Sequence, residues 1–344
     1  MKVTIDKLYK KIQTLNFTIW ENRAFKEHID EWLNNFENDQ EREYALYILS
    51  RMMYYSAANI RHLLKSLYRD KFRYPIIQEI RSMNSDTLDE SLIETEFKKE
   101  LKKTRFLGVG NPSESGVHLL YYFRQENNIP KDLFVNTDDL VYFEKDAHGN
   151  VKPCLRDKFK DVKRYIFIDD ICGSGTQATS DDSNVRRCVT NLRSLLPDAN
   201  ISYLMLFGLS TGIKKVREFP QNEAVKMYNM VDTVIELDES YKCFGNDSRY
   251  FTNVDNFDKN KARDVAYKYG YKLAEFLARQ QGFTNPVDIH NVADYRALGF
   301  GNNQLLIALH HNTPDNTLPI IWFDEDESIW TPVFKRYNKN YEHI

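Results

Sequence analysis

Two adjacent carboxylates, Asp169 and Asp170, end an apolar run, and small or hydroxyl-bearing residues follow them at once; the sequence over 165–177 is YIFIDDICGSGTQ. Small residues let backbone amides face inward, and such amides bind an anion such as phosphate when they lead into a helix. Two carboxylates beside this loop would repel a bare phosphate, but they suit a ligand that also presents hydroxyl groups or a hydrated Mg²⁺. A phosphorylated sugar presents both, so the stretch predicts a site for one.

The position of these residues in the predicted elements supports a ligand site. Residues 164–168 are typical of a buried strand, and ligands of open α/β sheets bind beyond the carboxyl ends of strands. The alternative is an ordinary strand–turn–helix, in which the acidic residues cap the helix and the glycines only form turns. A Walker-type phosphate loop is excluded, because no Gly-Lys-Ser/Thr occurs there.

The elements that position the stretch differ along the chain. The first hundred residues contain no glycine, and residues 41–69 carry apolar side chains at three- and four-residue spacings, which predicts helices. After residue 103, apolar strands alternate with helical segments, a pattern typical of a mostly parallel sheet flanked by helices. We therefore predict an α/β protein with a helical N-terminal module over 1–103. The α/β domain is expected over 104–344, with a C-terminal insertion and a hood-like segment.

The composition sets broad limits on function. The chain has 344 residues, of which 42% are hydrophobic, and its net charge of −3 gives no global case for binding nucleic acid or membranes. The four cysteines show no metal-binding spacing, and their low number favours a reducing compartment. Neither a secretory leader nor a run of 18 uncharged apolar residues is found. These features predict a cytoplasmic protein that does not span a membrane.

The stretch over 165–177 resembles the ribose-phosphate signature of the type I phosphoribosyltransferases, which has four apolar residues, two acidic residues and a short loop of small and hydroxyl residues. The resemblance implies that Asp169 and Asp170 hold the ribose hydroxyls, directly or through water bound to Mg²⁺, and that residues 174–177 hold the 5′-phosphate. Ser174 replaces the usual Thr and keeps its hydroxyl. Gln177 stands where Thr is usual, unless Thr176 takes that role through a one-residue shift. The implied ribose-phosphate site is Asp169, Asp170, Cys172, Gly173, Ser174, Gly175, Thr176 and Gln177, with the two aspartates as metal ligands.

The resemblance implies two further loops around the same ligand. The diphosphate is expected at the early loop, residues 109–116, where the candidates are Gly110, Asn111, Ser113, Ser115 and Gly116. Members of the family also carry a mobile loop that closes over the reacting centre, and the polar stretch 144–163 occupies this interval. Its cations are suited to neutralising a departing diphosphate; they are Lys145, Lys152, Arg156 and Lys158, with Lys152 and Arg156 as the catalytic candidates. The alternatives are a generic strand–helix turn for the first loop and a solvated basic loop or hairpin for the second.

The segment LLIALHHNTPDNTLPIIW, residues 305–322, ends a predicted strand with two histidines. We expect His311, Asn312 and Thr313 to lie near the base or the phosphate, and the alternative is a turn fixed by Asn and Pro residues. The segment is similar to one in a divergent branch of phosphoribosyltransferase-like proteins from bacterial conflict systems, some of which accompany retrons as anti-phage effectors. This resemblance implies a reverse transcriptase with its non-coding RNA, or a DNA-binding protein, as partner. The fold also commonly forms homodimers.

Two classes of function remain open. The first is a phosphoribosyltransferase, or another glycosyltransferase-class enzyme of nucleotide N-glycosidic bonds, that binds 5-phosphoribosyl diphosphate or a nucleotide with Mg²⁺. The second is a non-catalytic nucleotide sensor whose partner docks on the basic helical stretch 61–81, although a basic helical face is often simply solvated. A dinucleotide enzyme is disfavoured, because no Gly-x-Gly-x-x-Gly follows a strand with an acidic residue about 20 positions later.

Overall fold

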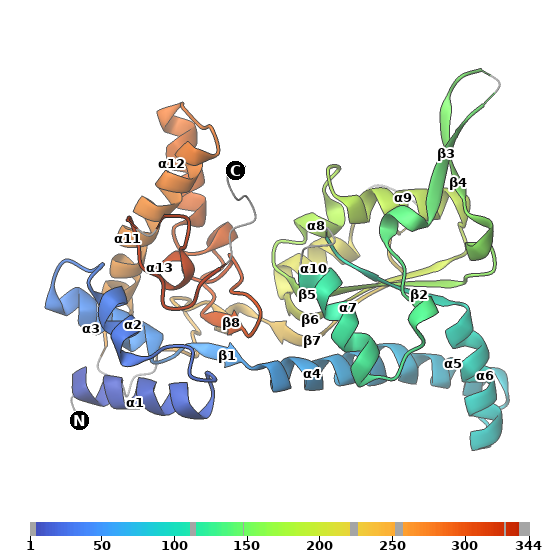
Figure 1. Ribbon diagram of the computed structural model, residues 1–344, viewed down its shortest axis with the longest axis horizontal. Coiled ribbons are helices and arrows are strands. Elements are labelled where there is room, and N and C mark those ends of the chain that lie inside the picture. The colour runs from blue at the N-terminus through green and yellow to red at the C-terminus, as the bar shows by residue number, and fades with distance from the viewer. Residues whose placement is uncertain are drawn as a thin grey trace. The chain divides into compact units, whose positions relative to one another are not determined.

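The chain folds into two compact units. The computed structural model describes residues 5–110, 115–146, 148–220, 226–251, 257–326 and 328–336. Unit 1 contains Met1–Ile60 and Asp238–Ile344, and unit 2 contains Arg61–Leu237 (Figure 1). The expected division at 103/104 therefore falls inside unit 2, and the second half of the chain is shared between the units.

A parallel sheet forms the centre of unit 2, as the alternating pattern predicts. Its strands are β2 (Thr104–Gly108), β5 (Arg164–Cys172), β6 (Asn200–Leu209) and β7 (Met230–Leu237), in the order β2-β5-β6-β7. Phe134 makes a parallel bridge to Phe106 of β2, while β2 pairs with β5 through its other edge. The chain thus runs outward from β2 on one side and then continues on the other, so the strand order reverses between β2 and β5.

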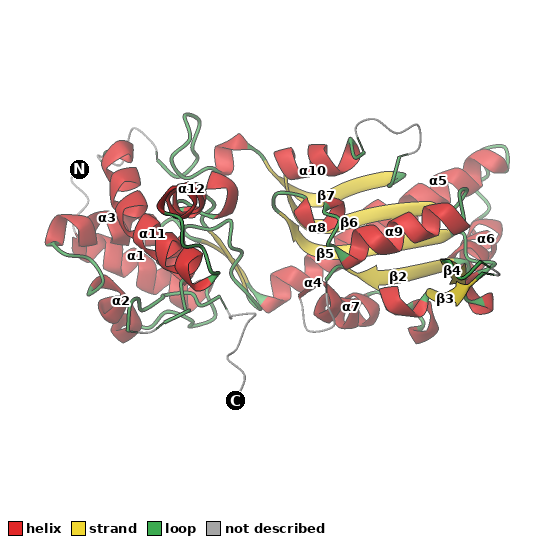
Figure 2. Cartoon of the chain, turned by 90° about the horizontal axis from the view of Figure 1, so that it is seen from above, coloured by secondary structure: helices red, strands yellow, loops and turns green. Residues whose placement is uncertain are grey.

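Helices cover both faces of this sheet. They are α4 (Ala57–Ser66), the π-helix η1 (Leu67–Arg73), α5 (Tyr74–Met83), α6 (Glu90–Lys102), α7 (Ser115–Glu126), α8 (Thr176–Thr179), α9 (Asn184–Leu195) and α10 (Ser210–Arg217), with short 3₁₀ turns at Lys131–Leu133, Thr137–Asp139 and Asp157–Phe159. Figure 2 shows α9 lying across β5 and β6. The opposite face is packed by aromatic rings: Phe106 of β2 contacts Phe72 at 5.0 Å and Phe123 at 5.4 Å between ring centroids.

An ion-pair cluster explains why the helices before residue 103 belong with the sheet. Arg164, the first residue of β5, has a side chain only 11% exposed and pairs with Glu79 of α5 at 2.7 Å. Its other nitrogen pairs with Glu100 of α6. Although burial by itself raises the pKa of Glu100, the hydrogen bond and the charge of Arg164 lower it below its usual value.

Replacing Arg164 with Met is expected to destabilise unit 2 by about 2 kcal/mol at pH 7, less than the loss of a fully buried pair because Glu79 is half exposed. The folded-state pKa of Glu100 is depressed, so the pair stabilises the fold above the unfolded pKa of about 4.3 and loses this effect as the pH falls through the folded value. Urea unfolding should therefore show that the variant has a lower free energy of unfolding than the wild type at pH 7, and that this difference is smaller at pH 3. Lys160→Met, which removes an exposed pair with Asp157, is the control; equal deficits at both pH values would contradict this account.

The basic stretch over 61–81 lies mostly in contact with acidic residues. Arg61 and Lys65 both pair with Glu126, at 2.6 and 3.0 Å. Further ion pairs join Lys71 to Asp232, Arg73 to Glu94 and Arg69 to Asp70. These contacts favour a structural role for the basic residues over a nucleic-acid surface.

Unit 1 joins the two ends of the chain. Its elements are α1 (Ile5–Thr18), α2 (Lys26–Leu33), α3 (Asp39–Leu49), β1 (Met53–Tyr55), the 3₁₀ turn Glu239–Tyr241, α11 (Lys259–Gln280), α12 (Pro286–Arg296), the 3₁₀ turn Phe300–Asn302, β8 (Ile307–Leu309) and α13 (Pro319–Trp322). The strands β1 and β8 pair in parallel, and one apolar core includes Trp20, Trp32, Trp322 and Trp330. In the part of the chain that the structure describes, no helix is long and apolar enough to cross a membrane.

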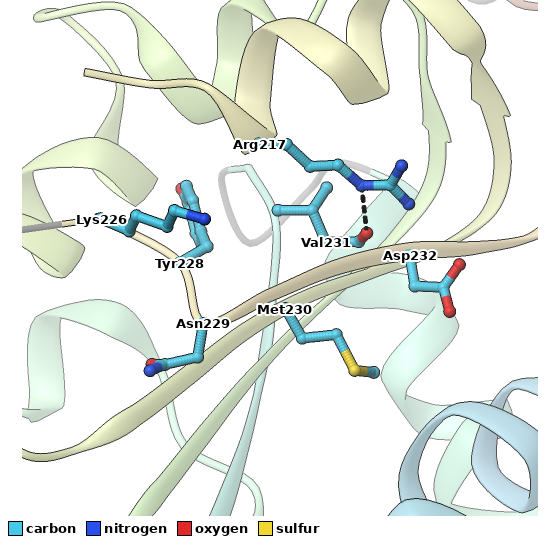
Figure 3. A pocket seen from close by; sticks show the side chains of 7 residues that line it. All are labelled: Arg217, Lys226, Tyr228, Asn229, Met230, Val231 and Asp232. Atoms are coloured by element: carbon cyan, nitrogen blue, oxygen red, sulfur yellow. Dashed lines mark hydrogen bonds between the residues drawn. The ribbon is translucent and has the colours of Figure 1, made fainter. Parts of the chain in front are cut away.

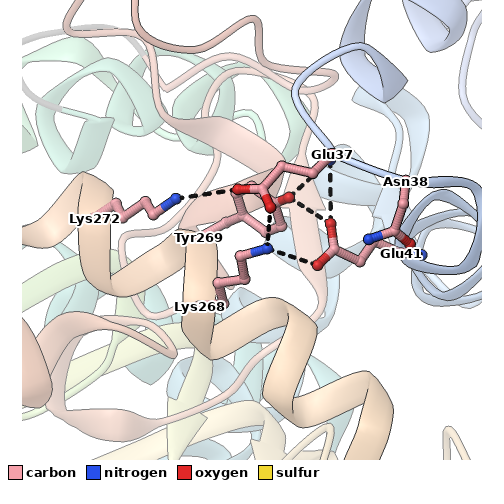
Figure 4. A network of polar contacts seen from close by, with 6 residues as sticks. All are labelled: Glu37, Asn38, Glu41, Lys268, Tyr269 and Lys272. Carbon is pink, nitrogen blue, oxygen red and sulfur yellow. Dashed lines mark hydrogen bonds and ion pairs between the residues drawn. The ribbon is translucent and has the colours of Figure 1, made fainter.

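A polar network also fastens α3 to α11 (Figure 4). Lys268 lies 2.7 Å from both Glu37 and Glu41, and the Tyr269 hydroxyl donates to Glu41 at 2.5 Å. The backbone N–H of Glu37 in turn donates to the Tyr269 hydroxyl. Residues more than 220 positions apart thus form one unit, which local sequence patterns do not reveal.

Candidate functional site

The candidate site lies at the carboxyl ends of β2 and β5, where the strand order reverses. In open α/β sheets, ligands bind in the crevice at this kind of reversal. The early loop follows β2. Residues 173–177 follow β5 and run into the first residues of α8 (Thr176–Thr179); this stretch is called the phosphate loop after its predicted ligand. The fold therefore brings the ends of the two predicted ligand loops to adjacent strands.

Asp169 is held inside the protein. Only 3% of its surface is exposed, and the hydroxyl of Tyr203, from the neighbouring strand β6, donates to its Oδ2 at 2.5 Å. Its Oδ1 accepts the backbone N–H of Asp170 at 3.0 Å. Burial, and then the charge of Asp170, raise the pKa of Asp169 well above its ordinary value. Burial and the Asp169 charge likewise raise the pKa of Tyr203, so its hydroxyl remains a donor.

Asp170 follows in the same strand and is also buried, with 5% of its surface exposed. Its Oδ1 accepts the backbone N–H of Ile171 at 2.8 Å. The side chains of Asp169 and Asp170 lie close together, because a hydrogen bond between them contributes, after burial and the charge of Asp170, to the raised pKa of Asp169. The strand continues through Cys172, since Ile171 and Cys172 still pair with β6, so the acidic pair lies within the strand and not after it.

The phosphate loop connects β5 to the short helix α8. Gly175 has φ +74° directly before α8, a conformation that favours glycine. The hydroxyls of Ser174 and Thr176 lie 2.8 Å apart, while Thr176 and Gln177 are exposed. Cys172 is buried, which raises the pKa of its thiol to about 12. The loop thus places two adjacent hydroxyls at an exposed turn.

Helix α10 supports the phosphate loop through glycines that the sequence analysis did not identify. A Cβ on Gly212 would lie 2.0 Å from the carbonyl oxygen of Gly173, and one on Gly175 would lie 3.0 Å from the carbonyl oxygen of Gly212. Lys215 of the same helix is close enough for its charge to lower the pKa of Cys172 against the effect of burial. The available signal was the sequence GLSTGIKK directly after a buried strand. Tyr203 was also missed, although a Tyr inside an apolar strand needs a partner for its hydroxyl.

A glycine lies at each described end of the early loop. Gly110 has φ +98°, and a Cβ on Gly116 would lie 2.3 Å from the carbonyl oxygen of Val109. The start of α7 therefore packs directly on the end of β2. The predicted residues Asn111 and Ser113, and the side chain of Ser115, lie outside the described residues.

The catalytic candidates Lys152 and Arg156 are not brought to the acidic pair. The stretch around them forms an antiparallel hairpin of β3 (Val141–Lys145) and β4 (Val151–Leu155), the hairpin alternative of the sequence analysis. Figures 1 and 2 show it at the opposite end of the sheet from α8. The contacts agree, because Tyr165, near the amino end of β5, donates to the carbonyl of Phe159 just after the hairpin. Lys152 is exposed, and Arg156 lies over the ring of Tyr142.

The residues expected near the base belong to unit 1. Asn312 closes a tight turn with Leu309 through two backbone hydrogen bonds of 2.9 and 3.2 Å. Thr313 is buried and donates to the carbonyl of Phe334. The Nδ1 atom of His310 lies 2.8 Å from Oε2 of Glu21 in the same unit. These contacts match the turn alternative. His311, Asn312 and Thr313 lie in unit 1, whereas Asp169 and Asp170 lie in unit 2.

The acidic pair offers two buried carboxylates as possible metal ligands. Among the described residues, no three His, Cys, Asp or Glu side chains converge as a metal cluster. Mg²⁺ usually keeps several waters and binds through one or two carboxylates together with the phosphates of a substrate. Asp169 and Asp170 therefore suit an ion that arrives with an anionic ligand, and they do not form a cage of their own.

A cavity of about 330 Å³ lies elsewhere in unit 2 (Figure 3). Its lining includes Lys226, Asn229 and Met230, at the amino end of β7. Arg217 of α10 also lines it and donates to the carbonyl of Val231 at 3.0 Å. Because the sheet is parallel, this cavity is at the end away from the acidic pair.

Comparisons with known proteins gave one structural match and one family match. The solved structure of Helicobacter pylori xanthine-guanine-hypoxanthine phosphoribosyltransferase is similar, with 10% identity, a TM-score of 0.24, and coverage of 54% of this chain and 89% of that one. No curated protein matches the sequence. The profile of the family PRTase-CE matches residues 29–336, which include the acidic pair, both ligand loops and most of unit 1. The chain therefore belongs to the phosphoribosyltransferase-like family PRTase-CE, in agreement with the resemblance carried by its acidic strand and glycine loop.

Proposed function

We propose that this protein binds a ribose-phosphate ligand, either 5-phosphoribosyl diphosphate or a nucleotide, together with Mg²⁺, and acts at the anomeric carbon of the ribose. The observation that carries the proposal is the Asp169–Asp170 pair, two buried carboxylates directly before a glycine and hydroxyl loop where the strand order reverses. Hydroxyl groups and a metal-bound phosphate are the groups that such a pair and such a loop complement.

The chemistry asks for positioning more than for a strong nucleophile. Breaking a bond at the anomeric carbon leaves positive charge on the ribose, so a site gains rate by holding the sugar and by stabilising the departing group. In this protein the acidic pair would orient the ribose hydroxyls, and the amides and hydroxyls of the phosphate loop would hold the 5′-phosphate. The early loop and Mg²⁺ would take the charge of the departing diphosphate.

A second candidate is a nucleotide sensor that binds the ligand without turnover. The observation that favours it is the position of Lys152 and Arg156 at the far end of the sheet, which leaves the cations expected to assist the departing group away from the acidic pair. Lys215 of α10 is a cation nearer the site, since its charge acts on the Cys172 thiol.

The setting of the protein is part of the proposal. The similarity of residues 305–322 to proteins of bacterial conflict systems supports an effector role in anti-phage defence. Its partner would then be a retron reverse transcriptase with its RNA, or a DNA-binding protein. All four cysteines are outside disulfides, which suits a reducing compartment such as the cytoplasm.

Phosphorus NMR separates the enzyme from the sensor. The protein is incubated with 5-phosphoribosyl diphosphate and Mg²⁺, alone and with purine or pyrimidine bases in turn, and Asp170→Asn serves as the matched inactive variant. A free pyrophosphate signal that grows with the wild type but not with Asp170→Asn supports the enzyme. Tight binding of the diphosphate without any pyrophosphate would support the sensor. If the protein neither binds the diphosphate nor releases pyrophosphate, the result contradicts a ribose-phosphate site.

A further inference from the structure

Tyr203 is a buried polar residue in the middle of an apolar strand. It lies on β6 opposite Phe167, two positions before Asp169 in the register, and 1% of its surface is exposed. Its neighbours in this core cluster are apolar or weakly polar residues such as Met205 and Val189. A buried tyrosine hydroxyl usually requires a partner, and here that partner is the carboxylate of Asp169 at 2.5 Å.

Asp169 in turn fixes the backbone of the next residue. With Oδ2 occupied by Tyr203, its Oδ1 accepts the N–H of Asp170 at 3.0 Å. Both oxygens of Asp169 are thus engaged within the protein, and its surface is 3% exposed. A carboxylate held in this way is well placed to fix the position of Asp170, whose side chain also forms a hydrogen bond with it.

We infer that Tyr203 is a positioning residue of the ribose-phosphate site: it locks Asp169, and through Asp169 it orients Asp170, the carboxylate that meets the ribose hydroxyls. This inference rests on the proposed function and divides the acidic pair into a supporting and a ligand-facing member. Tyr203 and Asp169 then act as one unit, because neither can hold Asp170 without the other.

The chain supplies a matched control. Tyr165 lies in the same core cluster and is also fully buried, but its hydroxyl donates to the carbonyl of Phe159 at 3.4 Å, towards the amino end of β5. Tyr165→Phe therefore removes the same atom from the same core without touching the acidic pair.

The test is a double-mutant cycle read as the Kd of 5-phosphoribosyl diphosphate with Mg²⁺, by calorimetric titration well below the unfolding temperature of each variant. Tyr203→Phe and Asp169→Asn should each weaken binding about tenfold, the effect of losing one hydrogen bond to a charged group. The double variant should also lose about tenfold and not a hundredfold, since the two residues act as a unit. Tyr165→Phe should bind within twofold of the wild type.

The outcomes separate this inference from the proposed function. Losses that multiply in the double variant, or an unchanged Kd in Tyr203→Phe, would overturn the positioning role. The proposed function would still stand in that case, provided that the wild type binds the diphosphate. A wild type that does not bind the diphosphate would overturn the proposed function itself. If Tyr203→Phe fails to fold, Asp169→Asn compared with Asp170→Asn decides the matter. The inference requires Asp170→Asn to bind at least tenfold more weakly than Asp169→Asn, and equal losses in the two variants would contradict it.

Discussion

Asp170→Asn is expected to weaken the binding of 5-phosphoribosyl diphosphate strongly while leaving unit 2 at least as stable as in the wild type. The amide oxygen of Asn can still accept the N–H of Ile171, so the backbone of β5 keeps its contact. The charge that meets the ribose hydroxyls and Mg²⁺ is lost, and the combined effect should be at least about a hundredfold in Kd. The repulsion that raises the pKa of Asp169 disappears at the same time, which favours the folded state.

Opposite changes in binding and stability distinguish a ligand-binding carboxylate from a structural one. Calorimetry gives the Kd, and thermal unfolding gives the stability of the same sample. Asp161→Asn, an exposed carboxylate in the loop before β5, is the control and should change neither quantity. Binding by Asp170→Asn within threefold of the wild type would remove Asp170 from the site.

Gly212→Ala is expected to be the most damaging single-methyl change in unit 2. The new Cβ would lie 2.0 Å from the carbonyl oxygen of Gly173. The position of a Cβ is fixed by its backbone and the oxygen is a backbone atom, so no rotamer change can separate them. Either α10 or the phosphate loop must move, at a cost of about 3 kcal/mol, the upper range for overpacking. Because the loop begins at Gly173, binding of the diphosphate should weaken by more than tenfold in the fraction that still folds.

The exposed neighbour Thr211 on the same helix provides the comparison, since Thr211→Ala alters α10 without approaching the loop. Urea unfolding and calorimetric titration are measured on both variants. Wild-type stability and affinity in Gly212→Ala would show that α10 does not support the loop.

The local features of unit 2 could be predicted from the sequence because local patterns specify them. The apolar run before Asp169 predicts β5, and the glycines and hydroxyls after it predict the turn that leads to α8. Alternating strands and helices predict the parallel sheet, which the structure confirms. The buried residues of α9, such as Val185, Val189 and Leu192, also recur at three- and four-residue spacings, as in an amphipathic helix.

The remaining features depend on contacts between distant residues. The division into units follows from pairs such as Arg164 with Glu79 and Lys268 with Glu37, which join segments 85 and 231 positions apart. Tyr203 meets Asp169 across two strands, and no spacing in the sequence reports a cross-strand contact of this kind. The direction of the β3–β4 hairpin is also a tertiary property, which is why basic residues in the expected interval lie far from the acidic pair.

The central claim is a ribose-phosphate site at Asp169–Asp170. Calorimetric titration of 5-phosphoribosyl diphosphate into the wild-type protein, with and without Mg²⁺, tests it most directly. The account predicts saturable binding at one site per chain that weakens strongly when Mg²⁺ is removed with a chelator. A folded protein that gives no binding heat with Mg²⁺ present, and no shift in thermal unfolding at millimolar diphosphate, would contradict it.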